Sequence, residues 1–379
     1  MLRILIGLVA ACAALALPAA AQQKIELAIA TGGTGGVYYP LGGGMANVLS
    51  RNVPGMAATA EVTGGSVANL QLIGSGKQQY IALSMTDAAQ DAYKGVDKFK
   101  DNKVDVRTLM ILYPNRMHVV TIEGTGISRM ADLKGKRVAW VVGAPSLNQN
   151  ITALLASANL TWKDVKRVDF GGFGAAMEGI ISNQVDAAFS STISGPAYKI
   201  AASPRGIQYP VLPHGDKAAW ERLNKIAPFY VRGWGAEGAD LSPEKKVEGA
   251  TYPYPVLMSM ANADAGLVYN MTKAMVELFP EYKDGAPGNV GWDIKRQIYA
   301  WAIPMHEGAI KYFKEIGTWT AEHQKHNDGL LARQKVLADA WKAYMAKAPS
   351  DDKEFAQGWM KARADALTKA NMNVVLESW

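Results

Sequence analysis

The stretch TGGTGGVYYP, residues 31–40, joins a short apolar run to a helical pattern and decides the fold class. The preceding run, residues 24–30, alternates apolar and other side chains, which predicts a β-strand. A helix is expected over residues 39–51. Glycine lets a bound group approach the backbone closely, and the first N–H groups of a helix have no partner within it. Because those groups carry the positive end of the helix dipole, the turn is a candidate site for a carboxylate or a phosphate.

Two further junctions have the same character, TGGSVAN at residues 63–69 and GAPSLNQN at residues 143–150. Apolar runs and helical patterns alternate around them. The other expected strands are 60–63, 80–85, 108–113, 118–123, 137–142 and 185–189, and the other expected helices are 67–74, 147–158 and 175–183. Strands that alternate with helices predict an α/β fold with mainly parallel sheets.

The serines at these junctions have a second interpretation. Ser66 is a good N-cap, and Ser146 with Gln149 fits a capping box. A dinucleotide-binding turn is excluded, because Tyr38 stands where the third glycine of the fingerprint belongs, and no acidic residue fits at the ribose position. A phosphate loop ending in Gly-Lys-Ser/Thr is absent.

The amino-acid composition limits the classes of protein to which this chain can belong. The chain has 379 residues, a formal net charge of +6 and 49% apolar residues, which is enough for one large or two medium domains. The positive charge is spread along the chain without Lys/Arg blocks, which argues against nucleic acid as a partner. The sequence has no Gly-x-Ser-x-Gly or His-Glu-x-x-His motif, and its one cysteine, Cys12, lies in the N-terminal segment. We therefore expect neither an enzyme nor a cofactor.

Histidine supplies the candidate metal ligands. His323 and His326 lie three residues apart on an expected helix, where they could bind a metal, but such a pair more often belongs to a solvated face. His118 and His306 are expected to be structural. No metal site is predicted.

The first 21 residues have the pattern of a secretory signal peptide. Arg3 precedes an apolar run over residues 4–17, Pro18 ends that run, and three alanines allow cleavage before Gln22. The run is shorter than the roughly 20 residues that span a membrane. Residues 9–12 also resemble a bacterial lipobox, which would make Cys12 a lipidation site. The segment predicts export to the periplasm.

Two larger patterns concern domain organisation. Residues 64–84 and 171–190 both pass from a Gly-Gly turn through a helix to a strand, which two similar lobes facing one cleft would produce. After residue 315 the chain is rich in Ala, Lys and Asp, with apolar positions at helical spacing. Two or three amphipathic helices are expected there, which would pack on the outside of a lobe or dock a partner.

Several motifs together resemble one family. The chain is similar to the TAXI-type solute receptors of TRAP transporters, a branch of the type II periplasmic binding proteins. The resemblance covers roughly residues 24–317 and is carried by VYYPLGGGMA (37–46), TGGSVANL (63–70), LYPNRMHVV (112–120), ADLKGKRVAW (131–140) and IPMHEGAIKYFKEIG (303–317). In the turn at residues 144–148 the chain departs from the Gly-Ser-Gly-Thr-Glu type of sequence usual in that family, which puts glutamate-like ligands in doubt.

The resemblance implies an α/β, two-lobed type II periplasmic binding protein fold with extra C-terminal helices. Lobe 1 would comprise residues 24–114 and 229–317, lobe 2 residues 115–228, and the C-terminal helical extension residues 318–379. The chain would cross between the lobes near Tyr113-Pro114 and Pro228-Phe229. A small organic acid or amino acid would bind in the cleft of a monomeric receptor and pass to a TRAP membrane subunit. The alternative is an ABC-type receptor for an aromatic, sulfonate or thiamine-precursor ligand.

The same resemblance implies which residues bind. They are Thr34, Gly35, Gly36, Val37, Tyr38, Ser66, Asn69, Ser146, Asn148, Gln149 and Ser190. Arg116 and Arg232 lie near the implied crossings, where each could pair with a carboxylate or form an ordinary salt bridge. Aromatic side chains that reach the cleft would distinguish the two kinds of receptor, and the candidates are Trp140, Trp234 and Tyr254.

Overall fold

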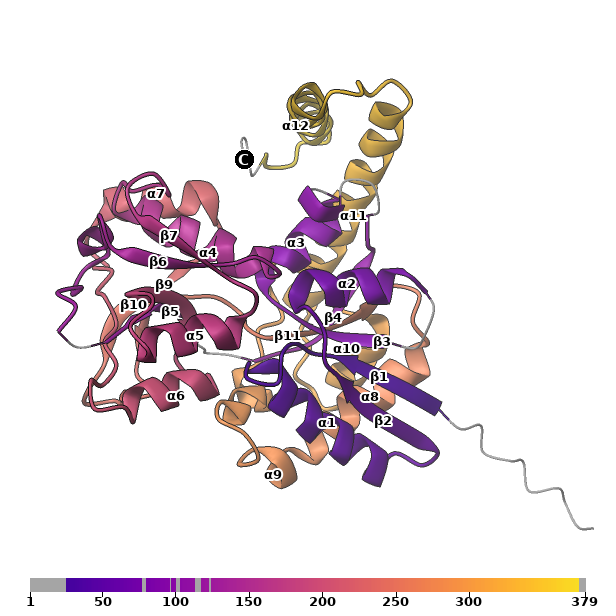
Figure 1. Cartoon of the computed structure of the whole chain (residues 1–379). Coiled ribbons are helices and arrows are strands. Elements are labelled where there is room, and N and C mark those ends of the chain that lie inside the picture. Colours follow the sequence, from indigo (N-terminus) through magenta and orange to yellow (C-terminus); the bar gives the residue numbers. More distant parts are fainter. Residues whose placement is uncertain are drawn as a thin grey trace, which may run out of the picture.

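The chain forms two α/β lobes that lie side by side, with a helical hairpin attached to one of them (Figure 1). The computed structural model describes residues 25–76, 80–95, 97–99, 103–112, 117–122 and 124–374. The expected signal peptide, Cys12, Arg116 and the Tyr113-Pro114 crossing lie outside these residues. Among the helices that are described, none combines the length and apolarity needed to span a membrane.

Lobe 1 is built on a five-stranded sheet with the order β2-β1-β3-β11-β4. The central strand β1 runs parallel to β2 and β3, whereas β11 is antiparallel to β3 and β4. The strands are β1 (Ile25–Ala30), β2 (Met56–Glu61), β3 (Tyr80–Ser84), β4 (Val106–Ile111) and β11 (Val256–Met260). The helices are α1 (Tyr38–Asn52), α2 (Ser66–Gly74), α3 (Thr86–Lys94), α8 (Ala265–Glu277), α9 (Phe279–Tyr282) and α10 (Glu307–Glu315), with 3₁₀ turns at Asp97–Phe99, Asn289–Trp292 and Ile294–Arg296.

Lobe 2 is built on a four-stranded sheet with the order β5-β8-β6-β7, in which β6 runs parallel to β7 and β8. The strands are β5 (Met117–Thr121), β6 (Arg137–Val141), β7 (Lys166–Phe170) and β8 (Ala187–Ser191). The helices are α4 (Pro145–Ser157), α5 (Phe173–Ile181), α6 (Gly195–Ala201) and α7 (Lys217–Ile226), with a 3₁₀ turn at Met130–Leu133. A separate two-stranded sheet pairs β9 (Val231–Gly235) with β10 (Val247–Thr251).

The two Gly-Gly segments noticed in the sequence occupy equivalent places. In lobe 1 the chain passes from β2 through α2 to β3, and both strands pair with β1; in lobe 2 it passes from β7 through α5 to β8, and both strands pair with β6. The expected α/β alternation is therefore confirmed. Strand β2 begins at Met56, before the expected range 60–63, because small residues with partly exposed side chains form most of it. Strand β7 and helix α3 were not expected.

The second crossing comes later than the sequence suggested. The expected boundary at residues 228/229 assigned β9 and β10 to lobe 1, but hydrogen bonds attach this pair to lobe 2. The amide of Leu212 donates to the Glu248 carbonyl (3.2 Å), and that of Ala239 donates to the Thr192 carbonyl (2.8 Å). The chain returns to the lobe 1 sheet between the ends of β10 and β11, at residues 252–255. The sequence of this segment, YPYP, contains no pattern that would have marked it as a crossing between the lobes.

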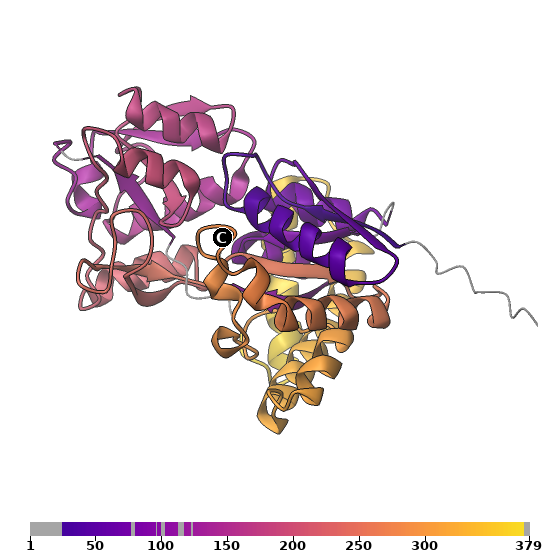
Figure 2. The same cartoon turned by 90° about the horizontal axis from the view of Figure 1, so that it is seen from below.

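The lobes share one continuous apolar core at the base of the molecule. It includes Leu83 of β3, Leu154 of α4 and Tyr252 from the second crossing, all of which are buried. Figure 2 shows the two lobes from below, again side by side.

The expected C-terminal extension consists of two helices within the described residues, α11 (Ala321–Met345) and α12 (Asp352–Lys369). The first half of α11 lies along lobe 1, where the Tyr93 hydroxyl donates to the Leu330 carbonyl (2.8 Å). Helix α12 packs on the far half of α11 through Trp341 and Trp359, whose rings are 4.7 Å apart (Figure 1). The extension thus has a small aromatic core of its own.

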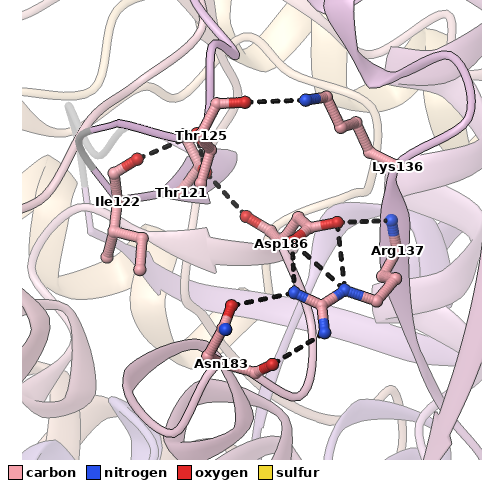
Figure 3. Close-up of polar contacts among 7 residues, drawn as sticks. All are labelled: Thr121, Ile122, Thr125, Lys136, Arg137, Asn183 and Asp186. Carbon is pink, nitrogen blue, oxygen red and sulfur yellow. Dashed lines mark hydrogen bonds and ion pairs between the residues drawn. The ribbon is translucent and has the colours of Figure 1, made fainter.

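A polar network fastens the lobe 2 strands at the edge away from the helix-starting turns (Figure 3). Asp186, just before β8, accepts hydrogen bonds from the backbone amide (2.8 Å) and the guanidinium (2.6 Å) of Arg137, the first residue of β6. Arg137 also donates to the Asn183 carbonyl (2.7 Å), and Thr121 of β5 donates to the Asp186 carbonyl (2.6 Å). Burial alone would raise the pKa of Asp186, but the hydrogen bonds from Arg137 hold it below its usual value.

We predict that Asp186→Asn destabilises the protein at pH 7 and does so less as the medium becomes acidic. A carboxyl whose pKa is lowered by folding stabilises the folded state above its ordinary pKa, near 3.8, and loses that contribution as the pH falls through the folded value. Urea unfolding at pH 7, 4 and 3 measures the difference. Asp169→Asn, at an exposed ion pair with Arg167, is the control. A constant difference across this range would contradict the prediction.

Candidate functional site

A cavity of about 400 Å³ lies between the lobes, where the carboxyl ends of their parallel strands face each other. Ligand sites in open α/β sheets form at such edges, and the volume suits a small molecule. Glycine turns form much of the wall. It is lined by 32–38, 63–67, Met85, Val141, 143–147, 171–174, Ser190, Ser191 and Tyr254.

Four helices begin at this cavity, and none has a side-chain cap. The N-cap residues of α1, α2, α4 and α5 are Val37, Gly65, Ala144 and Gly172, and no side chain bonds to the first amides of these helices. Of the other described helices, α3 and α9 also lack a side-chain cap, whereas six are capped by the side chain of the N-cap residue. These caps are Ser194, Asp216, Asp264, His306, Thr320 and Asp351. The capping interpretation of Ser66 and Ser146 is therefore wrong, because both lie inside the first helical turn.

The turns of opposite lobes meet through glycines. A Cβ placed on Gly35 would lie 3.9 Å from the Cα of Gly174, and one placed on Gly64 would lie 4.0 Å from the carbonyl oxygen of Gly143. Gly65 has φ +93°, a conformation that favours glycine, and it precedes the first residue of α2. The structure is thus a closed arrangement in which backbone from both lobes covers the cavity.

Tyr38 and Ser66 form the wall on the lobe 1 side. Their hydroxyls are 2.8 Å apart, and the Ser66 oxygen accepts a hydrogen bond from the Met85 amide (3.1 Å). The Tyr38 ring lies against Tyr254, with 5.5 Å between centroids. Burial raises the pKa of Tyr38 well above its usual value, so its hydroxyl is neutral. One of the two hydroxyl protons is used in the bond between them, which leaves one that can be donated toward the cavity.

Ser146 and Ser190 are on the lobe 2 side. The Ser146 hydroxyl is buried and has no hydrogen-bond partner among the described residues, although the residue lines the cavity. The Ser190 hydroxyl lies 2.8 Å from that of Ser194 and donates to the Ser191 carbonyl (3.0 Å). Ser146 is therefore the side chain whose hydrogen-bonding capacity is left for a ligand.

The structure brings together Thr34, Gly35, Gly36, Val37, Tyr38, Ser66, Ser146 and Ser190 around the cavity. It does not place Asn69 there. The Asn69 side chain donates to the carbonyls of Thr31 (2.6 Å) and Leu83 (2.7 Å), and its oxygen accepts from Thr63 (2.5 Å). This amide ties the first two turns to β3, which corrects the expectation that it faces a ligand.

Asn148 and Gln149 are likewise absent from the cavity wall. The Asn148 side chain accepts from the Val141 amide (2.9 Å) and donates to the Val141 carbonyl (2.8 Å). It closes the turn between β6 and α4 and so holds Ser146 in position. The sequence showed a polar residue near the turn but not which way it pointed.

The cationic and aromatic candidates also lie elsewhere. Arg232 covers the Trp220 ring at 5.3 Å, and Arg167 covers the Trp140 ring at 4.1 Å. Trp234 lies under Lys246. Of the three aromatic candidates only Tyr254 lines the cavity, and no Lys or Arg is found among the lining residues that the structure describes. Arg116 lies outside the described residues.

The paired histidines have structural partners. His323 Nδ1 accepts from the Thr320 amide (3.1 Å), and His326 Nε2 lies 2.7 Å from the Trp301 carbonyl oxygen. Within the part of the chain that the structure describes, no three His, Cys, Asp or Glu side chains are grouped to hold a metal ion.

Sequence reasoning missed Asp87. This residue is 1% exposed and lies in the first turn of α3, beside Ser146 and Asn150 of the opposite lobe. Burial raises the pKa of its carboxyl to about 6, although the Ser146 hydroxyl and the Ala88 amide lower it in part. The available signal was its position just after β3, at the same kind of strand–helix junction as the glycine turns.

Comparison with protein families assigns the chain. The model of the NMT1-like family matches residues 29–317, more than two thirds of the sequence. The chain belongs to the NMT1-like family. The matched range includes both lobes and ends before α11, so the helical extension is outside it.

Solved structures of solute-binding proteins are similar in fold at low identity. The alkanesulfonate-binding protein SsuA from Xanthomonas axonopodis pv. citri, bound to MOPS, is 14% identical over 85% of this chain and 94% of its own, with a TM-score of 0.45. R. palustris Rpa4515 with adipate is 9% identical over 85% and 98%, with a TM-score of 0.47. SsuA from Escherichia coli is 14% identical over 92% and 93%, with a TM-score of 0.40. The two-lobed α/β class with added C-terminal helices agrees with the strand orders described above.

We predict that Asn148→Ala lowers the free energy of unfolding by about 1–3 kcal/mol. The substitution leaves the buried amide and carbonyl of Val141 without their side-chain partner, and a buried polar group that loses its partner costs that much. Urea unfolding gives the value. Gln149→Ala, at the neighbouring position, is the control and should stay near the wild type. Equal stability of the two variants would contradict the assigned role.

Proposed function

We propose that the protein is an extracytoplasmic solute-binding receptor that captures a small organic acid in the cleft between its lobes. The observation that carries this proposal is the convergence of four uncapped helix starts, two from each lobe, on one closed cavity. Six other helices are capped by polar side chains, although α3 and α9 are not. The unpaired backbone N–H groups at these helix starts are explained if a ligand accepts hydrogen bonds from them.

The electrostatics favour an anion. Each helix start carries roughly half a positive charge, and its N–H groups bind carboxylates or phosphates without a cationic side chain. Since the described lining residues include no Lys or Arg, the backbone is the source of positive potential within the part of the site that the structure describes. The donors available beside it are the Ser146 hydroxyl and one of the two hydroxyls of Tyr38 and Ser66.

The rest of the wall is apolar and sets the size of the ligand. Val37, Leu147, Phe173 and the Tyr254 ring face the same cavity of about 400 Å³. An acid with a short apolar portion, or an amino acid, fits this combination. Only the closed form touches the ligand from both lobes, so binding favours closure.

The transport role extends the same reasoning. A receptor that captures a solute acts by delivering it, and the signal-like segment at residues 1–21 favours a periplasmic location. The motifs shared with TAXI-type receptors favour a TRAP membrane subunit as the partner of a monomeric receptor. A gene for such a subunit beside this one supports that partner, whereas a transport ATPase gene supports the ABC alternative.

The ABC-type alternative also has an observation in its favour. Tyr38, Phe173 and Tyr254 bring three aromatic rings to the cavity, and rings of this kind suit an aromatic or sulfonate ligand. A sulfonate is held by the same helix amides as a carboxylate. The two proposals therefore share the anion site and differ in the body of the ligand and in the transporter.

A thermal-shift screen of the mature protein tests the class of ligand. Carboxylates, amino acids, alkanesulfonates and neutral aromatic compounds form its four arms. An acid present at 100 times its dissociation constant adds about 2.7 kcal/mol to the stability. Stabilisation by neutral apolar compounds alone would overturn the anion site, and hits confined to aromatic sulfonates would favour the ABC alternative.

Replacing one helix amide tests the role of the backbone. Gly174 is the second residue of α5, it lines the cavity, and a Cβ placed there meets no atom within 4 Å. Proline is accepted at this helical position, as Pro280 in α9 shows. Gly174→Pro removes one donor and should weaken binding of an acid about tenfold or more, because a hydrogen bond to a charged group contributes about 1.5–3 kcal/mol.

Gly174→Ala keeps the amide and is the matched control. It should bind the same acid as the wild type does. Isothermal titration of both variants gives the comparison, and circular dichroism checks that each remains folded. Equal affinities for the two variants would exclude this amide from the site.

A further inference from the structure

A carboxyl group is buried directly behind the proposed anion site. Asp87 is 1% exposed, and its carboxyl makes no hydrogen bond of good geometry with the described residues, although the Ser146 hydroxyl and the Ala88 amide lie near enough to lower its pKa. It belongs to lobe 1, but Ser146 and Asn150 of lobe 2 are its side-chain neighbours. An acid sealed between two lobes beside an anion site requires an explanation, because a buried charge is costly unless it is paired or neutralised.

The groups around Asp87 are polar and uncharged. Tyr38 approaches from α1, Tyr230 from the segment before β9, and Tyr252 and Tyr254 from the second crossing. Burial raises the pKa of all four tyrosines, so each is neutral at physiological pH. Among the described residues, these surroundings offer no positive charge to balance an ionised Asp87.

Ser146 is the neighbour with unused capacity. The oxygen of Asn150 already accepts from the Tyr230 hydroxyl (2.7 Å), and its amide nitrogen donates to the Ser146 carbonyl (2.7 Å). The Ser146 hydroxyl makes no hydrogen bond of good geometry with the described residues, it is a neighbour of the Asp87 carboxyl, and its residue lines the cavity. A hydroxyl has a single proton, so it can donate to only one side at a time.

We propose that Asp87 is a positioning residue of the cleft: its carboxyl takes up a proton as the lobes close on an anion and thereby leaves the Ser146 hydroxyl free to donate to that anion. The inference rests on the proposed function, since it requires an anionic ligand. When Asp87 is ionised, Ser146 donates to it and turns its lone pairs toward the cavity. When Asp87 is protonated by a proton from solvent, its O–H donates to the Ser146 oxygen, and the serine proton points to the ligand.

The direction of the pH effect follows from burial. In an open form Asp87 would be solvated and titrate near its ordinary value of 3.8, whereas in the closed structure the pKa is about 6. Closing therefore takes up a proton between these values. Affinity for an anion should rise about tenfold from pH 7 to pH 5, as proton linkage requires for one group with this shift.

The first measurement is made in a saturating concentration of an acid probe, L-glutamate or glutarate, because the proposal concerns the closed form with ligand bound. Urea unfolding of the mature protein is compared at pH 7 and pH 5 for the wild type, Asp87→Asn and the control Asp339→Asn, which changes an exposed residue of α11. Relative to Asp87→Asn, the folding constant of the wild type should rise about tenfold at pH 5, since the unfolded carboxyl stays ionised there. The control should follow the wild type. Parallel behaviour of the wild type and Asp87→Asn overturns the proposal.

The second measurement uses L-glutamate, glutarate and ethanesulfonate as probes. Calorimetry in two buffers of different protonation enthalpy should show uptake of close to one proton per bound probe at pH 5 in the wild type. Asp87→Asn should bind with little pH dependence and, at pH 7, at least as tightly as the wild type. If Asp87→Asn does not fold, Asp87→Leu supplies an uncharged side chain of similar size for the same comparison.

The outcomes separate this inference from the proposed function. Binding that is independent of pH, or equally dependent in the wild type and the uncharged variants, overturns the inference alone. Affinity that falls as the pH falls also overturns the inference. It would mean that ionised Asp87 accepts a hydrogen bond from a donor group of the ligand, such as an ammonium. Failure of all three probes to bind any variant at either pH overturns the small-acid site, and the inference with it.

Discussion

Unpaired backbone N–H groups between two facing sheet edges are the constraint on which this structure depends. Parallel strands place every following helix start at the same edge, and the chain leaves four of those starts without a side-chain cap. Backbone N–H groups removed from water are stable only when an acceptor forms hydrogen bonds with them. Because the turns contain glycines, the two edges can approach closely: a Cβ placed on Gly35 would lie only 3.9 Å from the Cα of Gly174. The fold, the closed arrangement and the proposed anion site thus have one origin.

The sequence revealed this arrangement because glycine turns and apolar periodicity are local signals. The three junctions at residues 31–40, 63–69 and 143–150 could be recognised without any knowledge of the lobes. Side-chain direction was not available in the same way. Asn69 and Asn148 stand in the right turns, but their amides satisfy backbone groups of neighbouring strands, and only the tertiary pairing determines that.

Two other features depended on distant contacts. The pair β9 and β10 joins lobe 2 through backbone hydrogen bonds to Leu212 and Thr192, so no local pattern marked the later crossing. Asp87 looked like an ordinary acidic residue in the first turn of a helix, where it interacts favourably with the dipole. Its importance arises because Ser146, distant in sequence, seals it from water.

Contact between the lobes and contact with a ligand involve different atoms of the cleft. Main-chain atoms of Gly35, Gly64, Gly143 and Gly174 form the seam where the lobes meet, whereas side chains such as Val37, Leu147 and Phe173 shape the chamber inside. Substitutions in the chamber can alter which molecule is accepted without disturbing the seam. Proteins with this architecture can therefore differ in the ligand they bind while their lobes close in the same way.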